Sequence, residues 1–140
     1  LLIQLGARNE VLPNQLEKLR SAIDKHFSLA TIPEVLTSLE SEVSPDFKDW
    51  ASQTYSLMTK RSPISMVGTQ MMLQYGKKLN LSDCFAMEFG LVKVWLKEGD
   101  FVEGVRALII DKDNSPKWRY SLEQLTPQVM QPFFAHVKPH

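Results

Sequence analysis

The chain has 140 residues, of which 44% are hydrophobic and 23% charged, a composition typical of a globular protein with one domain and one core. Its 16 basic and 16 acidic residues balance and are interspersed, so charge provides no footprint for DNA, RNA or an anionic membrane. The single cysteine, Cys84, excludes an internal disulfide and is typical of a reducing compartment.

Helical periodicity begins near the N-terminus. Apolar residues three and four positions apart predict a helix over Pro13–Phe27. Thr31, with Glu34 three residues later, predicts a capping box at the start of a short second helix. The apolar Leu1–Leu5 has the character of a strand that would belong to a missing domain, and no signal-peptide pattern is visible. We therefore expect the chain to be part of a longer protein.

Two serine–proline pairs predict the next two helix starts. Ser44-Pro45 opens a third helix, which ends before Lys60 and Arg61, whose charges suit the helix dipole there. Ser62-Pro63 opens a fourth helix at once, and that helix ends near Gly76. The third and fourth helices should therefore meet at a sharp corner.

The fifth predicted helix is the most apolar segment. Asn80 or Ser82, together with Asp83, predicts its start, and Gly99 predicts its C-cap. Because apolar residues occupy most of its positions, we expect it to lie at the centre of the fold. Gly90 within it costs about 1 kcal/mol relative to alanine, which suggests a close helix crossing.

The last two predicted helices follow from capping patterns. Asp100, with Glu103 three residues later, predicts a capping box, and Ser115-Pro116 belongs to the polar turn that ends this sixth helix. Thr126-Pro127 starts a short final helix. No hairpin or alternating strand pattern is visible, so the predicted fold class is an all-α helical array.

Candidate catalytic groups are few. His26 lies at a predicted helix end, where it suits the dipole better than a catalytic role. Glu88 lies in the most apolar helix, where burial would make it a candidate for chemistry, but an ion pair with Arg106 or a lysine explains it as well. His136 and His140 fall in a C-terminal tail. No zinc-type spacing and no glycine-rich phosphate loop is present, so we expect no metal and no cofactor.

The stretch Asp100–Trp118 carries the most specific pattern in the chain. Its D-F-x-E-G-V-R-A-x-x-I-D-K-D-x-S-P-K-W resembles the C-terminal signature of the 3-hydroxyisobutyryl-CoA hydrolases, a branch of the crotonase (enoyl-CoA hydratase) superfamily. Three further segments agree with that family in order and spacing: Ile23–Leu36, Lys60–Ser65 and Met87–Phe89. The resemblance covers roughly residues 23–125.

This resemblance implies that residues 23–140 form the C-terminal helical domain of a crotonase-like α/β fold. Residues 1–22 would connect it to a missing N-terminal crotonase domain. In the family, the oxyanion hole and the catalytic carboxylate belong to that N-terminal domain, so we expect no catalytic residue in this chain. The helical domain would close over the acyl-CoA pocket or pack on a neighbouring subunit of a homo-oligomer.

Four residues are implied as CoA-binding by the same resemblance. Gly104 would allow close approach, and Lys112 and Lys117 would face CoA phosphates as point charges. Arg106 would do the same or brace the turn. The alternative for the two lysines is a solvated surface turn.

Two functions are compatible with this pattern. The first is the C-terminal portion of a mitochondrial 3-hydroxyisobutyryl-CoA hydrolase or hydrolase-like protein, which acts on an acyl-CoA in valine breakdown. The second is a non-catalytic family member built into the small subunit of the mitochondrial ribosome. The two differ in whether the upstream part keeps its glycine-rich oxyanion stretch and its acidic residue.

Overall fold

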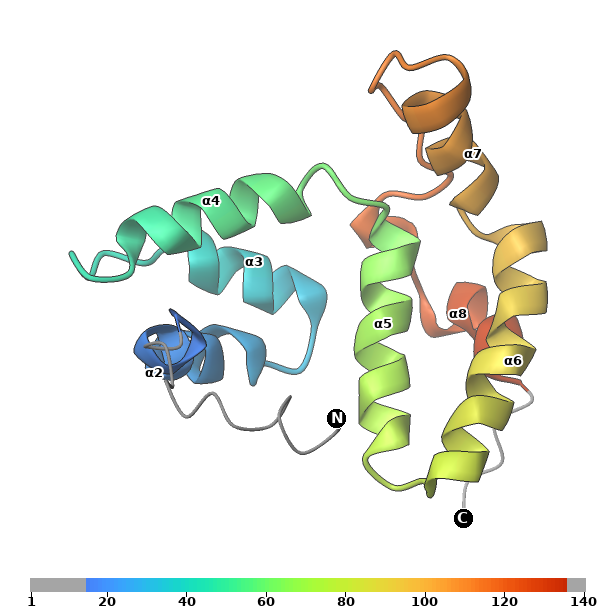
Figure 1. Ribbon diagram of the computed structural model, residues 1–140, viewed down its shortest axis with the longest axis horizontal. Coiled ribbons are helices and arrows are strands. Elements are labelled where there is room, and N and C mark those ends of the chain that lie inside the picture. Colours follow the sequence, from blue (N-terminus) through green and yellow to red (C-terminus); the bar gives the residue numbers. More distant parts are fainter. Residues whose placement is uncertain (1–14, 136–140) are drawn as a thin grey trace, which may run out of the picture.

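A computed structural model describes residues 15–135, and helices account for all of its regular secondary structure (Figure 1). The helices are α2 (Gln15–Phe27), α3 (Ile32–Glu40), α4 (Lys48–Met58), α5 (Pro63–Gly76), α6 (Leu81–Glu98), α7 (Phe101–Val105), the π-helical turn η1 (Arg106–Ile110), the 3-10 turn η2 (Leu122–Gln124) and α8 (Pro127–Phe134). The all-α prediction is confirmed over this range, where no strand occurs. The strand expected at Leu1–Leu5 lies outside the described residues, as do His136 and His140.

Helices α3 and α4 pack around a small core of their own. Its buried members are Val35, Leu39 and Ala51, with Trp50 and Met58 packed against them. The predicted capping box at the start of α3 is present: the Thr31 N–H donates to Glu34 Oε2 at 2.9 Å, and the Glu34 N–H donates to Thr31 Oγ1 at 3.4 Å.

The start of α4 differs from the prediction. The helix begins at Lys48, with Phe47 as its N-cap, and not at Ser44-Pro45. The Ser44 carbonyl accepts hydrogen bonds from the N–H groups of Phe47 and Lys48, which closes a separate turn before the helix. The Ser44 N–H donates to Glu42 Oε1 at 2.9 Å. This buried carboxylate therefore holds Ser44 in the turn, and the helix begins only at Lys48.

The second core lies among α5, α6 and α8. Its buried members are Ile64, Met87, Leu91, Met130, Phe133 and Phe134. Side-chain caps start all three helices as predicted: Ser62 Oγ accepts the Ser65 N–H at 3.2 Å, Asn80 Oδ1 accepts the Asp83 N–H at 2.9 Å, and Thr126 Oγ1 accepts the Val129 N–H at 3.4 Å. Asn80, and not Ser82, is therefore the cap of α6.

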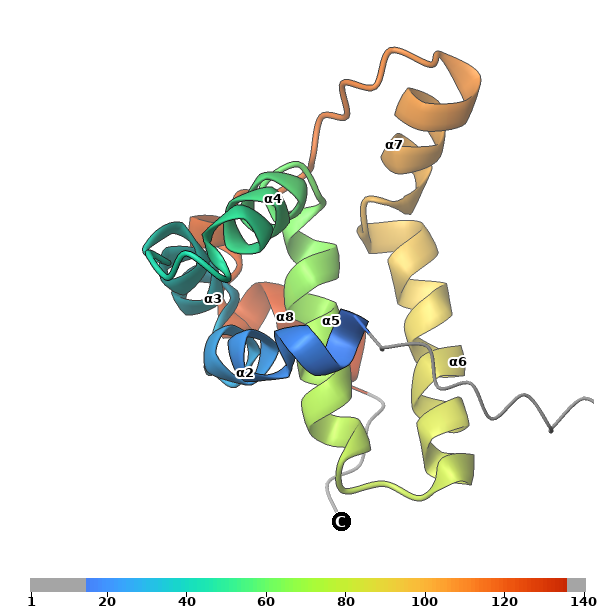
Figure 2. The ribbon, with the colours of Figure 1, turned by 60° about the vertical axis from the view of Figure 1, so that its left-hand side comes forward.

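Helix α6 is not central, which corrects the prediction. Figures 1 and 2 both place it at the outer edge of the array, where only Met87 and Leu91 are buried. Five large apolar side chains along its outer face are 50–73% exposed: Leu81, Phe85, Phe89, Val92 and Leu96. We call these five residues the α6 stripe. The helix is apolar on two faces, and the described chain covers one of them.

The close approach between α5 and α6 occurs at Gly68. A Cβ atom at Gly68 would lie 2.0 Å from Trp95 Cη2, so the Trp95 ring occupies the space that a side chain would need. Trp95 Nε1 donates to Ser65 Oγ at 3.2 Å, and the Trp95 ring meets Phe133 edge-on with centroids 5.0 Å apart. The close crossing expected at Gly90 therefore lies at Gly68 instead.

Candidate functional site

The segment that follows α6 is held by two carboxylates. Asp100 Oδ2 accepts a hydrogen bond from Ser62 Oγ at 2.6 Å, and Asp100 Oδ1 accepts the Arg119 N–H at 2.9 Å. Ser62 and Asp100 are both buried, with 7% and 5% of their surface exposed. Asp100 is the N-cap residue of α7, but its side chain caps nothing there. The capping box predicted for Asp100 and Glu103 is therefore wrong, because Asp100 binds Ser62 and Arg119, whereas Glu103 binds Arg106 and the Lys117 N–H.

Arg106 is bound by carboxylates and braces the turn after η1. Its Nε and Nη2 atoms each lie 2.8 Å from Glu103, and Nη1 lies 2.6 Å from Asp111 and 2.7 Å from Asp113. Nη2 also donates to the Ser115 carbonyl at 3.3 Å. Hydrogen bonds that Arg106 donates to these carboxylates, Glu103 foremost, raise the pKa of its guanidinium.

The same contacts lower the pKa values of two of the acidic partners, Glu103 and Asp113. The Arg106 hydrogen bonds, followed by the Lys117 N–H at 2.7 Å, lower the pKa of Glu103 to about 2. Arg106 likewise lowers the pKa of Asp113. Carboxylates of the protein therefore already neutralise the charge of Arg106, which favours the bracing role over a phosphate contact.

The two predicted CoA-binding lysines lie on the surface of this turn. Lys112 and Lys117 are both exposed, and no carboxylate in residues 15–135 forms an ion pair with either ammonium group. Lys112 adopts a left-handed backbone with φ of 54°, as does Asn114 with φ of 52°. Such a conformation is unfavourable for lysine and easier for asparagine. The Arg106 network holds the backbone of this turn, from which the two exposed lysine side chains extend.

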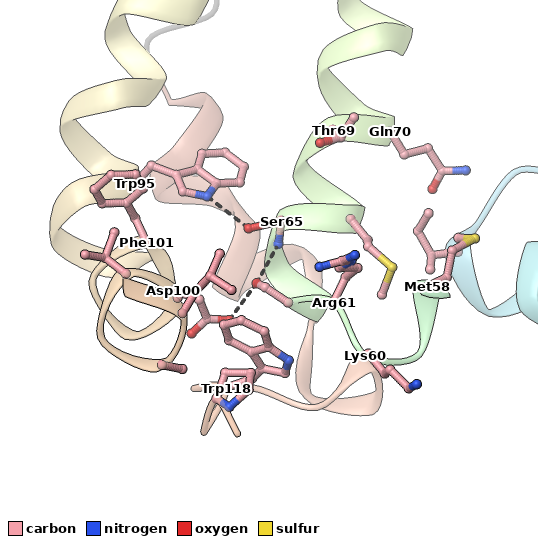
Figure 3. Close-up of a pocket in the computed structure, with 18 of the residues that line it drawn as sticks. Met58, Lys60, Arg61, Ser65, Thr69, Gln70, Trp95, Asp100, Phe101 and Trp118 are labelled. Atoms are coloured by element: carbon pink, nitrogen blue, oxygen red, sulfur yellow. Dashed lines mark hydrogen bonds between the residues drawn. The ribbon is translucent and has the colours of Figure 1, made fainter. Parts of the chain in front are cut away.

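A groove of about 1020 Å³ runs along α5 (Figure 3). One wall comes from α2 to α4 and the other from α6, α7 and η1. Apolar side chains that line it include Met58, Met66, Leu73, Trp95, Leu108 and Trp118. Gly104 also lines the groove, and a Cβ there would meet the Trp118 ring at 3.9 Å, which is ordinary contact. Gly104 therefore leaves space beside the Trp118 ring, but a side chain at this position would not clash with the ring.

Lys60 and Arg61 stand at the rim of this groove, on the corner between α4 and α5. In Figure 3, Lys60 lies at the lower right of the lining residues and Arg61 nearer the middle, with Trp95 and Trp118 to the left of both. Both are exposed, and neither forms an ion pair within residues 15–135. From the sequence, both were expected to suit the dipole of α4, and both belong to the family-like segment Lys60–Ser65. Both residues come directly before Ser62 in the chain. The hydrogen bond from Ser62 to Asp100 ties this corner to the opposite wall of the groove.

The two groups singled out as catalytic candidates have other roles. His26 is fully buried: Nε2 lies 2.9 Å from Glu42 Oε2, and Nδ1 lies 2.7 Å from Ser38 Oγ. It is thus part of a buried hydrogen-bond network. Glu88 is exposed on α6, which corrects the burial expected for it, and Arg106 is bound by other carboxylates.

Glu42 is the anionic centre of the His26 network. Hydrogen bonds from Lys25 Nζ at 2.7 Å and from the Ser44 N–H lower the pKa of Glu42 to about 2, with a smaller contribution from His26. The network joins α2 to the segment after α3. Within the described range, no group of histidine, cysteine and acidic side chains has the arrangement needed to hold a metal ion. None of the helices there has the length and hydropathy needed to span a bilayer.

Comparison with known proteins identifies the family. The protein-family model described as enoyl-CoA hydratase/isomerase matches residues 3–134. The chain belongs to this family. A solved structure of an enoyl-CoA hydratase from Rhodobacter sphaeroides 2.4.1 superposes with a TM-score of 0.77 at 27% identity, covering 96% of this chain and 41% of that one. The helical array is therefore a part of the crotonase fold.

Several curated relatives are similar to this member of the family. 3-Hydroxyisobutyryl-CoA hydrolase 1 of Arabidopsis thaliana is 32% identical over 120 residues, which are 83% of this chain and 32% of the relative. The mitochondrial 3-hydroxyisobutyryl-CoA hydrolase of Danio rerio is 35% identical over 109 residues, 78% of this chain and 28% of the relative. The small ribosomal subunit protein mS47 of Arabidopsis thaliana is 35% identical over 101 residues, 69% of this chain and 24% of the relative. The chain thus spans about a third of their length or less.

Proposed function

We propose that residues 23–140 act as the C-terminal helical domain of a mitochondrial 3-hydroxyisobutyryl-CoA hydrolase-like protein and form one wall of its acyl-CoA site. Residues 1–22 would lead to an N-terminal crotonase domain that supplies the catalytic groups. The names of the hydrolase relatives support the substrate class and the mitochondrial location.

The observation that carries the proposal is the apolar groove bordered by the family's signature segment. Trp118 and Gly104 from that segment line the groove, and Lys112 and Lys117 stand on the turn beside it. An acyl thioester of CoA has an apolar arm and a strongly anionic end, which suits apolar walls next to lysine side chains.

The test uses a protein that joins this chain to an N-terminal crotonase domain. Lys112→Ala and Lys117→Ala should each raise KM for 3-hydroxyisobutyryl-CoA by about two- to fivefold at low salt, the size expected for an exposed charged contact worth about 0.5–1 kcal/mol. The value of kcat should change little, since a remote phosphate contact is made alike in ground and transition states. Lys77→Ala, on the corner between α5 and α6, is the matched control. An unchanged KM in both lysine variants would mean that the turn is structural.

A second candidate is a structural role in the mitochondrial small ribosomal subunit, supported by the similarity to mS47. In that case the helices would serve as an interaction surface. Cosedimentation of the tagged protein with the small subunit, in the absence of thioesterase activity of the parent protein, would favour it.

A further inference from the structure

We propose that Ser38 is an acylation site, at which His26 and Glu42 activate the serine hydroxyl toward activated esters. The three residues lie near the end of α2, within α3 and directly after α3. None of them lines the groove along α5, and none belongs to the Asp100–Trp118 segment. This site is therefore independent of the proposed function.

The three side chains form a hydrogen-bonded chain from a carboxylate to a hydroxyl. Ser38 Oγ lies 2.7 Å from His26 Nδ1, and His26 Nε2 lies 2.9 Å from Glu42 Oε2. Figures 1 and 2 show α2 and α3 side by side, which brings the imidazole to the serine. Proteins activate a serine with this order of groups, in which the imidazole is the base and the carboxylate orients it. The geometry therefore provides a nucleophile, a base and an orienting group.

The environment of Glu42 determines where the protons lie. Glu42 accepts hydrogen bonds from Lys25 Nζ at 2.7 Å and from the Ser44 N–H at 2.9 Å, and these bonds lower its pKa to about 2. An ionised carboxylate can only accept, so the His26 proton that faces it lies on Nε2. In the neutral imidazole Nδ1 is then left as an acceptor for the Ser38 O–H. The hydroxyl thus points its proton at the base.

Burial separates the base from the nucleophile. His26 and Glu42 are buried, with 0% and 6% of their surface exposed, whereas Ser38 is half-buried. The Trp50 ring lies 6.1 Å from the His26 ring, measured between centroids, and is tilted by 40° to it. A base enclosed in this way is shielded from water, which strengthens its hydrogen bond to the hydroxyl. Of the three residues, Ser38 is therefore the one that a reagent in solution reaches.

The reaction transfers one acyl group to the serine. Ser38 Oγ attacks the carbonyl carbon of the ester and forms a C–O bond, while its proton moves to His26 Nδ1. The bond from that carbon to the alcohol oxygen then breaks, and the alcohol leaves with the proton from Nδ1. Ser38 lies inside α3, where the helix uses the neighbouring N–H groups, so they are not free to stabilise the carbonyl oxygen. We therefore expect a single slow acylation and not turnover.

The experiment treats the 140-residue chain with 4-nitrophenyl acetate and locates the acetyl groups over time by peptide mass spectrometry. Ser41 is the internal reference: it lies three residues on, it is exposed, and its hydroxyl donates to the Ser38 carbonyl at 3.1 Å. Ser38 should be acetylated at least about tenfold faster than Ser41, because a positioned general base contributes at least this much. Equal rates at the two serines would overturn the proposal.

Unfolding removes the geometry and leaves the sequence unchanged. In concentrated urea, Ser38 is no longer held beside His26, so Ser38 and Ser41 should be acetylated at similar rates. A preference for Ser38 that persists in urea would come from its neighbours along the chain and would contradict activation by His26 and Glu42. This comparison needs no substitution and therefore no variant that folds.

Two substitutions test the activating groups. His26→Gln removes the base and should reduce the rate at Ser38 to that at Ser41. Glu42→Gln removes the charge that orients the imidazole and should slow acetylation of Ser38 about tenfold without changing the rate at Ser41. Glu40→Gln, which removes an exposed charge on α3, is the matched control and should change neither rate. Circular dichroism establishes that each variant is folded; if His26→Gln unfolds, the ratio of the two rates in the unaltered chain decides. The same Ser38 rate in folded Glu42→Gln and Glu40→Gln would overturn activation by the carboxylate.

Discussion

Ser62 Oγ donates to Asp100 Oδ2 at 2.6 Å and thereby links the start of α5 to the start of α7, which are 38 residues apart. Because Ser62 also accepts the Ser65 N–H, one hydroxyl both caps a helix and satisfies a buried carboxylate. Ser62→Ala should lower the free energy of unfolding by about 2–3 kcal/mol, combining loss of a cap with loss of a hydrogen bond to a charged group. Urea denaturation measures this. Ser82→Ala, an exposed serine in α6, should change stability by less than about 0.5 kcal/mol.

The coupling within this pair can be isolated. Ser62→Ala, Asp100→Ala and the double variant form a thermodynamic cycle, and we expect a coupling free energy above about 1 kcal/mol because the two side chains touch. Additive effects within about 0.3 kcal/mol would show that the hydrogen bond contributes nothing beyond packing.

The Glu42 network should make stability depend on pH in the acid range. The folded pKa of Glu42 is about 2, whereas its ordinary value is 4.5, so the unfolded chain binds the proton more readily. Its stabilising contribution is therefore complete above about pH 4.5 and is lost as pH falls toward 2. Glu42→Gln should flatten the fall in urea midpoint over this window. Glu40→Gln, an exposed change on α3, should leave the profile as it is; identical profiles for the two variants would contradict the role of Glu42.

The space at Gly68 should not tolerate a methyl group. Gly68→Ala places a Cβ 2.0 Å from the Trp95 ring, which Ser65 and Phe133 hold in position, so the variant should lose about 1–3 kcal/mol of stability through overpacking. Gly76→Ala is the control: its added Cβ meets only Cys84 Sγ at 3.9 Å, and it should be neutral or slightly stabilising. Thermal unfolding of both variants decides this.

Removing the Trp95 ring should destabilise the fold more than crowding it with a methyl group at Gly68. Trp95→Ala should cost about 3–5 kcal/mol, as expected for deleting a large core aromatic side chain. A loss near zero would show that the packing between α5 and α6 does not depend on this ring.

The α6 stripe should make the isolated chain self-associate. Five exposed apolar side chains on one helix face favour contact with another apolar surface. Phe85→Ser/Phe89→Ser should reduce the association measured by sedimentation velocity. The double change should alter the free energy of unfolding by less than about 1 kcal/mol, because 63% of the surface of Phe85 and 69% of that of Phe89 are already exposed. Leu91→Ser, on the buried face of the same helix, should instead unfold the chain. Association that persists in the double variant would place the contact elsewhere.

The sequence predicts structure best where the interaction is local. Thr31, Ser62, Asn80 and Thr126 each cap a helix through a bond to the N–H three residues on, so spacing alone reveals them. Asp100 shows the same spacing pattern and does something else, because Ser62 and Arg119 compete for its oxygens from 38 and 19 residues away. No pattern along the chain records such competition.

The candidate site illustrates the same limit. Composition correctly indicates that α6 is apolar, but it does not tell which faces the remaining helices cover. The groove brings together residues from Phe27 to Trp118, so its existence depends on how the helices pack. The family resemblance indicated the Asp100–Trp118 segment as part of the site, whereas the position of Lys60 and Arg61 beside the groove follows only from the fold.

The groove also separates the two hydrophobic cores of the described chain. Val35 and Met58 border it from the first core and Trp95 borders it from the second, so a ligand there would touch both. Without a ligand, each core can open with its own free energy, and heat should melt the chain in two overlapping steps. A bound acyl-CoA would add contacts that belong to neither core alone, so the two steps should merge and move to higher temperature. The molecule that fills the groove would then determine whether this polypeptide unfolds as one cooperative unit or as two.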